Sequence, residues 1–185
     1  MSAERLQPTQ RRETARVFFA LWPPEETAGK LAGLAETYAA IAGGRPTRCA
    51  TIHLTLAFIG DVPLDRLVDL ERAARKVRAE AFDLTLDQFG LWRHNRIFWG
   101  GCSVVPPALA DLASALSVAL QAAGFDVADG RRNFFPHVTL VRKVKALDVP
   151  LPPGQTLPWR CTKFVLVRSD LSDSGASYQV LAEFP

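Results

Sequence analysis

The sequence has 185 residues with 22 basic and 19 acidic side chains, a formal net charge of +3, and 48% of its residues are hydrophobic. Disordered chains are poor in apolar residues and carry unbalanced charge, so this composition excludes a chain that is disordered throughout. The length suits one domain or two small lobes that share a cleft. Seventeen of the basic residues are Arg and five are Lys. Arg binds phosphate oxygens well, but composition alone attributes this bias to genomic base usage.

The cysteines and the first residues bear on the compartment of the protein. Cys49, Cys102 and Cys161 lie more than fifty residues apart, which is typical of free thiols in a reducing cytoplasm rather than of a zinc site or a redox dithiol. Residues 1–14 are polar and predict a flexible tail. The apolar run over 17–22 is too short for a signal-peptide core or a membrane span. We expect a cytoplasmic monomer that does not associate with membranes.

The first half of the chain alternates between strand and helix patterns. Aromatic and β-branched residues predict strands, and apolar residues at helical spacing between a Pro start and a Gly stop predict helices. The expected elements are a strand over 16–22, a helix from Pro23-Pro24 to Gly43-Gly44, a strand over 52–58, a helix over 63–79, a strand over 82–86 and a turn over 93–95.

The second half repeats this order. Its expected elements are a strand over 96–100, a helix from Pro106-Pro107 to Gly124, a strand over 135–141, a proline-rich loop over 147–158 and final strands over 162–168 and 178–184. Four features recur in one order at offsets of 80 to 84 residues: a strand, a Pro-Pro helix start, a Gly stop and a closing His-x-Thr-Leu. Such recurrence predicts an internal duplication, with units over about 16–60 and 96–142 inside one domain over 15–185.

The duplication predicts two pseudo-symmetric lobes, and we expect an α+β fold. Each lobe is expected to pack helices on one face of a mostly antiparallel sheet, with a cleft between the sheets. In a strand, residues i and i+2 point to the same face. His53 therefore lies beside Thr55, and His137 beside Thr139, while the hydrophobic residues between them face the core. A pseudo-two-fold axis would bring the two His-Thr pairs together across the cleft.

Paired histidines of this kind suit the cleavage of a phosphodiester. In-line displacement at phosphorus needs a base for the nucleophile and an acid for the leaving oxygen on the opposite side, and imidazole supplies both near neutral pH. Threonine hydroxyls and a guanidinium would stabilise the phosphoryl oxygens. Arg142, three residues after Thr139, is the candidate for that charge. A single His-x-Thr is weak evidence, but two at matching places in a repeat favour a site.

On these residues the chain resembles the two-histidine (2H) phosphoesterase superfamily, whose signature is a pair of His-x-Thr/Ser motifs in a bilobal domain. Within the superfamily it is most similar to the RNA 2′,3′-cyclic phosphodiesterases, which are also described as 2′-5′ RNA ligase-like. The segments that carry the resemblance are RVFFALW (16–22), IHLTLAFIG (52–60), FFPHVTLVRKV (134–144) and KFVLVRSDLS (163–172).

The resemblance implies both a reaction and the residues that perform it. It implies hydrolysis of a terminal 2′,3′-cyclic phosphate of RNA, such as a tRNA fragment, to a 2′-phosphomonoester without a metal or other cofactor, and it allows the reverse 2′-5′ ligation. It assigns His53 as proton donor and His137 as proton acceptor. Thr55, Thr139 and Arg142 become phosphate ligands.

Two alternatives remain open from the sequence. One is a cyclic phosphodiesterase that acts on small nucleotides such as the cyclic phosphate of ADP-ribose. The other is a non-catalytic module that binds RNA or nucleotides in the same cleft. Arginines near the turn and before the second motif are candidates for contacts between the cleft rim and the RNA backbone, although a solvated charge run explains the second pair equally well; they are Arg93, Arg96, Arg131 and Arg132.

Overall fold

The computed structural model describes residues 13–127, 134–146, 148, 150–152, 154–172 and 175–185. Residues 1–12 of the expected tail, and Arg131 and Arg132, lie outside this range. The strands are β1 Thr14–Leu21, β2 Arg45–Pro46, β3 Leu54–Pro63, β4 Phe82–Leu86, β5 Gln88–Trp92, β6 Ile97–Gly101, β7 His137–Arg142, β8 Leu157–Cys161, β9 Phe164–Ser172 and β10 Gly175–Phe184. The helices are α1 Glu25–Ala42, α2 Leu67–Ala74 and α3 Pro107–Ala122, with 3-10 turns η1 Cys49–Thr51 and η2 Leu64–Arg66. No helix in the described ranges is long and apolar enough to cross a membrane.

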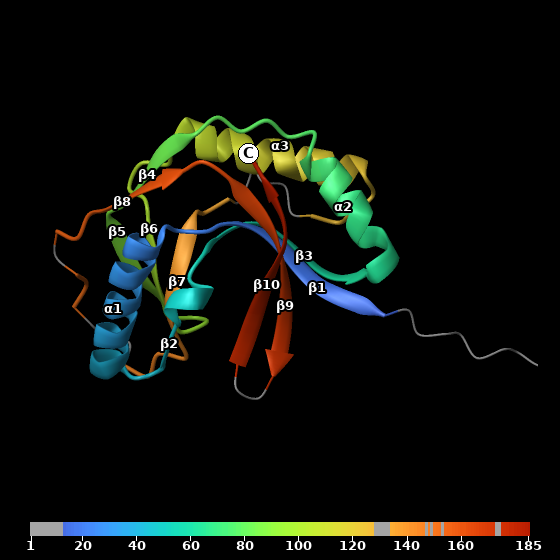
Figure 1. Ribbon diagram of the computed structural model, residues 1–185. Helices are drawn as coiled ribbons and strands as arrows, with labels where there is room; N and C mark the ends of the chain where they lie inside the picture. The colour runs from blue at the N-terminus through green and yellow to red at the C-terminus, as the bar shows by residue number, and fades with distance from the viewer. Residues whose placement is uncertain (1–12, 128–133, 147, 149, 153, 173–174) are drawn as a thin grey trace, which may run out of the picture.

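One antiparallel sheet carries both halves of the repeat (Figure 1). Its strand order is β10-β9-β1-β3-β7-β6-β5, and β2 pairs with β7. Strand β3, which begins directly after His53, and strand β7, which begins at His137, meet at its centre through the single pair Leu54 opposite Val138. The predicted α+β, mainly antiparallel fold is confirmed. The two sheets that we expected on either side of the cleft are joined into one, because these two strands pair where they meet.

The helix of each repeat unit packs on the strands of the other unit. Helix α1 contacts β7, and its Tyr38 ring stacks on Phe98 of β6 with centroids 4.4 Å apart. Helix α3 contacts β3 and α2. Figure 1 shows α1 beside the half of the sheet that carries β5, β6 and β7. Each half of the fold is therefore built from both units of the sequence.

Three strands, β2, β5 and β8, were missed by the sequence prediction, and one helix was overextended. Strand β5 lies between β4 and the predicted turn, and β8 lies at the end of the predicted proline-rich loop. In β8, Leu157, Trp159 and Cys161 are buried and alternate with exposed residues. Pro158 is tolerated because β8 pairs only with β4, in a separate two-stranded sheet where each strand has an open edge. The helix predicted over 63–79 consists of η2 followed by the shorter α2.

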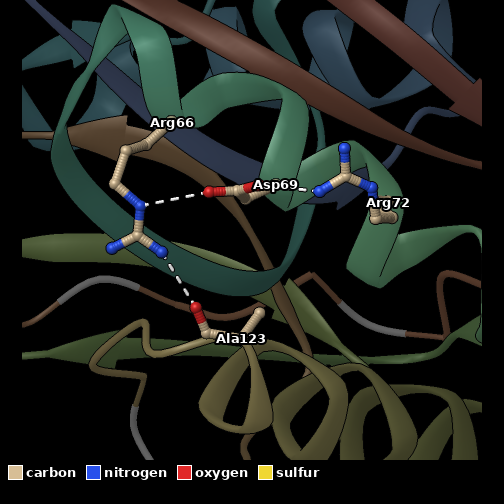
Figure 2. Close-up of polar contacts among 4 residues, drawn as sticks. All are labelled: Arg66, Asp69, Arg72 and Ala123. Carbon is tan, nitrogen blue, oxygen red and sulfur yellow. Dashed lines mark hydrogen bonds and ion pairs between the residues drawn. The ribbon is translucent and has the colours of Figure 1, made fainter.

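Arg66, at the end of η2, joins α2 to the C-terminal end of α3 (Figure 2). Its Nη2 donates to the Ala123 carbonyl at 2.9 Å, and its Nε donates to Asp69 at 3.3 Å. Its guanidinium also lies over the Phe125 ring, 4.3 Å from the centroid. Carbonyls at the end of a helix lack partners inside the helix, so this hydrogen bond satisfies one of them. Asp69 also accepts from Arg72 at 3.0 Å.

Candidate active site

A cavity of about 890 Å³ lies on the face of the large sheet that the helices leave uncovered. Strand alternation places it there. Leu54 and Val138 belong to the core that also includes buried leucines of α1 and α3. The residues one position further along each strand, Thr55 and Thr139, line the cavity. His53, His137 and Arg142 line it as well, so all five residues predicted for the chemistry are brought to one cavity.

The two histidines are held by the same local hydrogen bond. Nδ1 of His53 lies 2.8 Å from the carbonyl oxygen of Thr51, and Nδ1 of His137 lies 2.9 Å from that of Phe135. Because a carbonyl only accepts, Nδ1–H must be the donor in both rings. The neutral form of each ring therefore carries its lone pair on Nε2. The backbone two residues upstream thus selects the same tautomer in both motifs.

His53 sits among three aromatic rings. Trp22 stacks on it with centroids 5.5 Å apart and planes 13° apart, Phe18 lies at 4.8 Å, and Tyr178 meets it edge-on at 5.3 Å. Burial lowers the pKa of His53 to about 4. The hydrogen bond to Thr51 opposes this shift, and the positive charges of Arg142 and His137 add to it. With this pKa, His53 is neutral at pH 7.

Fewer aromatic rings surround His137 than surround His53. Trp92 of β5 meets its ring at 4.6 Å with an interplanar angle of 70°, and the Phe135 ring lies at 6.2 Å. Burial again lowers the pKa of His137, the hydrogen bond to Phe135 opposes the shift, and the charge of Arg142 adds to it. Both histidines therefore favour the neutral form until an anion enters the cavity, since negative charge nearby favours the imidazolium.

The cavity is positively charged by more arginines than the sequence singled out. Arg142 ends β7 directly opposite Arg45 of β2, and Arg16 and Arg48 also line the cavity. Arg48 donates from Nη2 to the Ala176 carbonyl at 2.7 Å and so ties the loop after β2 to β10. Among the lining residues that the structure describes, there is no Asp or Glu. Arg45 and Arg48 belong to no motif, and Arg16 only begins the segment RVFFALW (16–22), so the sequence analysis assigned none of the three to the site.

The arginines that the sequence suggested on the turn after β5 do not line the cavity. Asn95 lines the cavity, whereas Arg93 and Arg96 are exposed and are not among the lining residues. Trp92 lines the cavity and contacts His137. Trp99 is only 7% exposed, and within the described part of the chain its indole nitrogen has no hydrogen-bond partner. Over the same described ranges, no three His, Cys, Asp or Glu side chains gather as a metal site would require.

An antiparallel sheet with two His-Thr pairs in one basic cavity defines a two-histidine phosphoesterase fold, and the comparisons agree with it. The family profile described as LigT-like phosphoesterase matches residues 21–99. The RNA 2′,3′-cyclic phosphodiesterase of Escherichia coli strain K12 is 34% identical over 170 residues, which are 91% of this chain and 95% of that protein. The chain belongs to the LigT-like phosphoesterase family.

Further relatives extend this likeness. The RNA 2′,3′-cyclic phosphodiesterase of Thermus thermophilus is 30% identical over 184 residues, covering 91% of this chain and 89% of that protein. The crystal structure of E. coli LigT complexed with 3′-AMP superposes with a TM-score of 0.84 at 31% identity, over 93% of this chain and 98% of that one. The MHV ns2 PDE domain, at 13% identity and a TM-score of 0.60, shares the fold alone.

Proposed function

We propose that this protein hydrolyses a terminal 2′,3′-cyclic phosphate of RNA to a 2′-phosphomonoester by acid–base catalysis from two histidines. The observation that carries the proposal is the matched pair of imidazoles in one basic cavity, each with Nδ1 engaged by a backbone carbonyl and Nε2 left for chemistry. The relatives of this chain named RNA 2′,3′-cyclic phosphodiesterase support the same reaction.

In the proposed reaction the cyclic phosphate lies between the two rings. Nε2 of His137 accepts a proton from water, and the water oxygen bonds to phosphorus. The bond between phosphorus and the 3′ oxygen breaks, and Nε2–H of His53 donates its proton to that oxygen. One proton is taken up and one is released, so the step balances without a metal or other cofactor. Exchange of protons with solvent then restores the starting forms of both histidines.

The charge of the substrate prepares His53 for its role as acid. Burial holds the pKa of His53 at about 4, so the ring must gain a proton when the anionic phosphate binds. The assignment of His53 as acid and His137 as base follows the resemblance to the family. The hydroxyls of Thr55 and Thr139 donate to phosphoryl oxygens, and Arg142 balances the charge that grows on them.

A second candidate is a cyclic phosphodiesterase of small nucleotides. A cavity of about 890 Å³ is in the range of small-molecule sites and would hold a mononucleotide. E. coli LigT has been crystallised with 3′-AMP, with ATP and with NADP+. An RNA substrate would place only its chain end in the cavity, so the same cavity serves both substrates and a direct comparison of their turnover separates them.

The proposal is tested with an oligoribonucleotide that ends in a 2′,3′-cyclic phosphate, incubated in the presence of a chelator, followed by analysis of the end group. We expect a 2′-phosphate end and a bell-shaped dependence of kcat/KM on pH. A product with a 3′-phosphate end would contradict departure of the 3′ oxygen, and loss of activity in the chelator would contradict the metal-free mechanism. Preference for a small cyclic nucleotide would favour the second candidate, and binding without turnover would favour a non-catalytic module.

Substitution of each histidine checks its role. His53→Ala and His137→Ala are each expected to reduce kcat by about a hundred- to ten-thousand-fold, which is the range for loss of a general acid or base. His94→Ala is the matched control, because His94 lies on the exposed turn after β5. All three variants should keep the circular dichroism spectrum of the wild type. Full activity in either cavity variant would remove that histidine from the mechanism.

A further inference from the structure

We propose that Trp22 is a positioning residue that fixes the plane of the His53 imidazole and so sets the direction of its Nε2 in the cavity. This inference rests on the proposed function, in which Nε2–H of His53 donates the proton to the leaving oxygen. Trp22 directly follows β1 and is half-buried. It is absent from the described residues that line the cavity, so it acts through the histidine.

The hydrogen bond of His53 does not hold the ring plane by itself. Nδ1–H donates to the Thr51 carbonyl at 2.8 Å, which ties one corner of the ring. The torsion between Cβ and the ring of a histidine is soft, and a hydrogen bond tolerates roughly 30° of misalignment at the donor. The indole of Trp22 lies nearly parallel to the imidazole, with planes 13° apart and centroids 5.5 Å apart. A flat ring against the imidazole opposes the remaining rotation, so the two contacts together leave Nε2 one direction.

Trp22 belongs to a small apolar cluster on the face of the sheet that the helices leave uncovered. A one-sided antiparallel sheet usually carries polar residues on its open face. Here β1 is apolar on both faces, and only its odd-numbered residues from Val17 to Leu21 join the core that includes the helices. The open-face cluster consists of Phe18, Ala20, Val165 and Val167, with Trp22 and Tyr178 packed against them.

The position of this cluster is explained by His53. Three of its rings, those of Phe18, Trp22 and Tyr178, contact the imidazole. Tyr178 also meets the indole of Trp22 edge-on at 6.2 Å, so the stacked ring is itself supported from β10. The apolar residues that β1 and β9 place on the open face therefore form a support for one catalytic side chain.

The chain on both sides of Trp22 holds its backbone. Strand β1 is paired on both edges, with β9 and with β3. Pro23 and Pro24 follow Trp22, and Pro24 caps the start of α1. Proline fixes its own φ and restricts the preceding residue to extended conformations. The indole is thus preorganised by a central strand on one side and by the start of a helix on the other.

The second motif has no equivalent stack among the rings that the structure describes. Trp92 meets His137 at an interplanar angle of 70°, and Phe135 lies at 34° with centroids 6.2 Å apart. The proposed acid must deliver its proton to an oxygen that is fixed in the substrate, whereas the proposed base accepts one from a water molecule that can reorient. The parallel ring at His53 therefore supports the histidine whose direction matters more.

The kinetic test compares Trp22→Leu and Trp22→Phe on an oligoribonucleotide that ends in a 2′,3′-cyclic phosphate. Leucine keeps the apolar cover but has no plane, so kcat should fall by about ten- to a hundredfold, the cost of a small misplacement of a reacting group. KM should stay within about twofold, because the proposed phosphate ligands are untouched. Phenylalanine restores a flat ring and should retain most of kcat. Val118→Ala, at a residue of α3 that is 57% exposed, is the surface control.

The pKa of His53, followed through its ring signals in NMR, separates loss of the plane from loss of the cover. Trp22→Ala admits water and should raise the pKa of His53 from about 4 toward 6.5, whereas Trp22→Leu should leave it low. The charges of Arg142 and His137, which also act on His53, are present in every variant. The pKa of His137 is the internal control, because Trp22 has no ring contact with it in the described structure.

Two kinetic outcomes would overturn the positioning role. One is wild-type kcat in Trp22→Leu, and the other is a loss in Trp22→Phe as large as the loss in Trp22→Leu. A defect that lies in KM alone would overturn it as well. All variants should keep the circular dichroism spectrum of the wild type, and Trp22→Met, which is also apolar without a flat face, replaces Trp22→Leu if the latter does not fold.

A crystal structure of Trp22→Leu separates this inference from the proposed function. If the wild type does not turn over the cyclic phosphate, but the His53 ring leaves its plane in Trp22→Leu and keeps it in Trp22→Phe, the proposed function fails and the positioning role stands. A ring that stays in its plane in Trp22→Leu would overturn the role whatever the turnover.

Discussion

His53 should make the stability of the fold depend on pH in a way that one substitution removes. Burial among Phe18, Trp22 and Tyr178 holds the pKa of His53 at about 4, below the ordinary value of 6.5. Between these two pH values the unfolded chain binds a proton at this residue and the folded chain does not. The free energy of unfolding therefore rises with pH across this window. The stability that the neutral His53 contributes is lost as the pH falls from about 6.5 to about 4.

The expected size follows from the same two pKa values. Each pKa unit corresponds to about 1.4 kcal/mol, and between about pH 8 and about pH 5 the unfolded histidine takes up its proton while the folded one remains almost entirely neutral. His53 alone should then lower the free energy of unfolding by roughly 2 kcal/mol over this range. His137, whose pKa burial also lowers, contributes in the same direction.

Urea unfolding at about pH 8 and about pH 5 measures this difference in the wild type and in His53→Gln. The glutamine does not titrate, so the change between the two pH values should be smaller in the variant by roughly 2 kcal/mol, with contributions from other groups cancelling in the comparison. His94→Gln, on the exposed turn, should behave as the wild type does. An equal pH dependence in the wild type and in His53→Gln would refute the argument that the aromatic cage disfavours the imidazolium.

Two further predictions concern the scaffold that holds the site. Arg66→Met removes the hydrogen bond to the Ala123 carbonyl at the end of α3 and should lower the free energy of unfolding by about 1–2 kcal/mol in urea melts; an unchanged midpoint would mean that the two helices do not depend on this contact. Gly90→Ala places a Cβ against the Trp99 ring and should cost about 1–3 kcal/mol in the same assay; wild-type stability would show that the ring moves aside freely.

The local sequence pattern was sufficient to predict which residues meet in the candidate site. Alternation with period two along a strand is a property of consecutive residues, so the sequence predicted that Thr55 and Thr139 face away from the buried Leu54 and Val138, as the structure shows. The order of elements in the duplication is also visible in the local sequence. So are the Pro residues that start helices α1 and α3 and the Gly residues that end them. These elements form close to where the sequence predicts them.

Contacts between distant parts of the chain could not be predicted from the local sequence pattern. Arg48 binds the Ala176 carbonyl across 128 positions of sequence, and Tyr178 reaches His53 from the last strand. Strand pairing and the crossing of α1 and α3 onto the opposite halves of the fold create these neighbours. Residue type and spacing along one strand thus predict the candidate reacting groups. The charge and aromatic cover around them, and so the pKa of each histidine, arise when tertiary packing removes water from the rings.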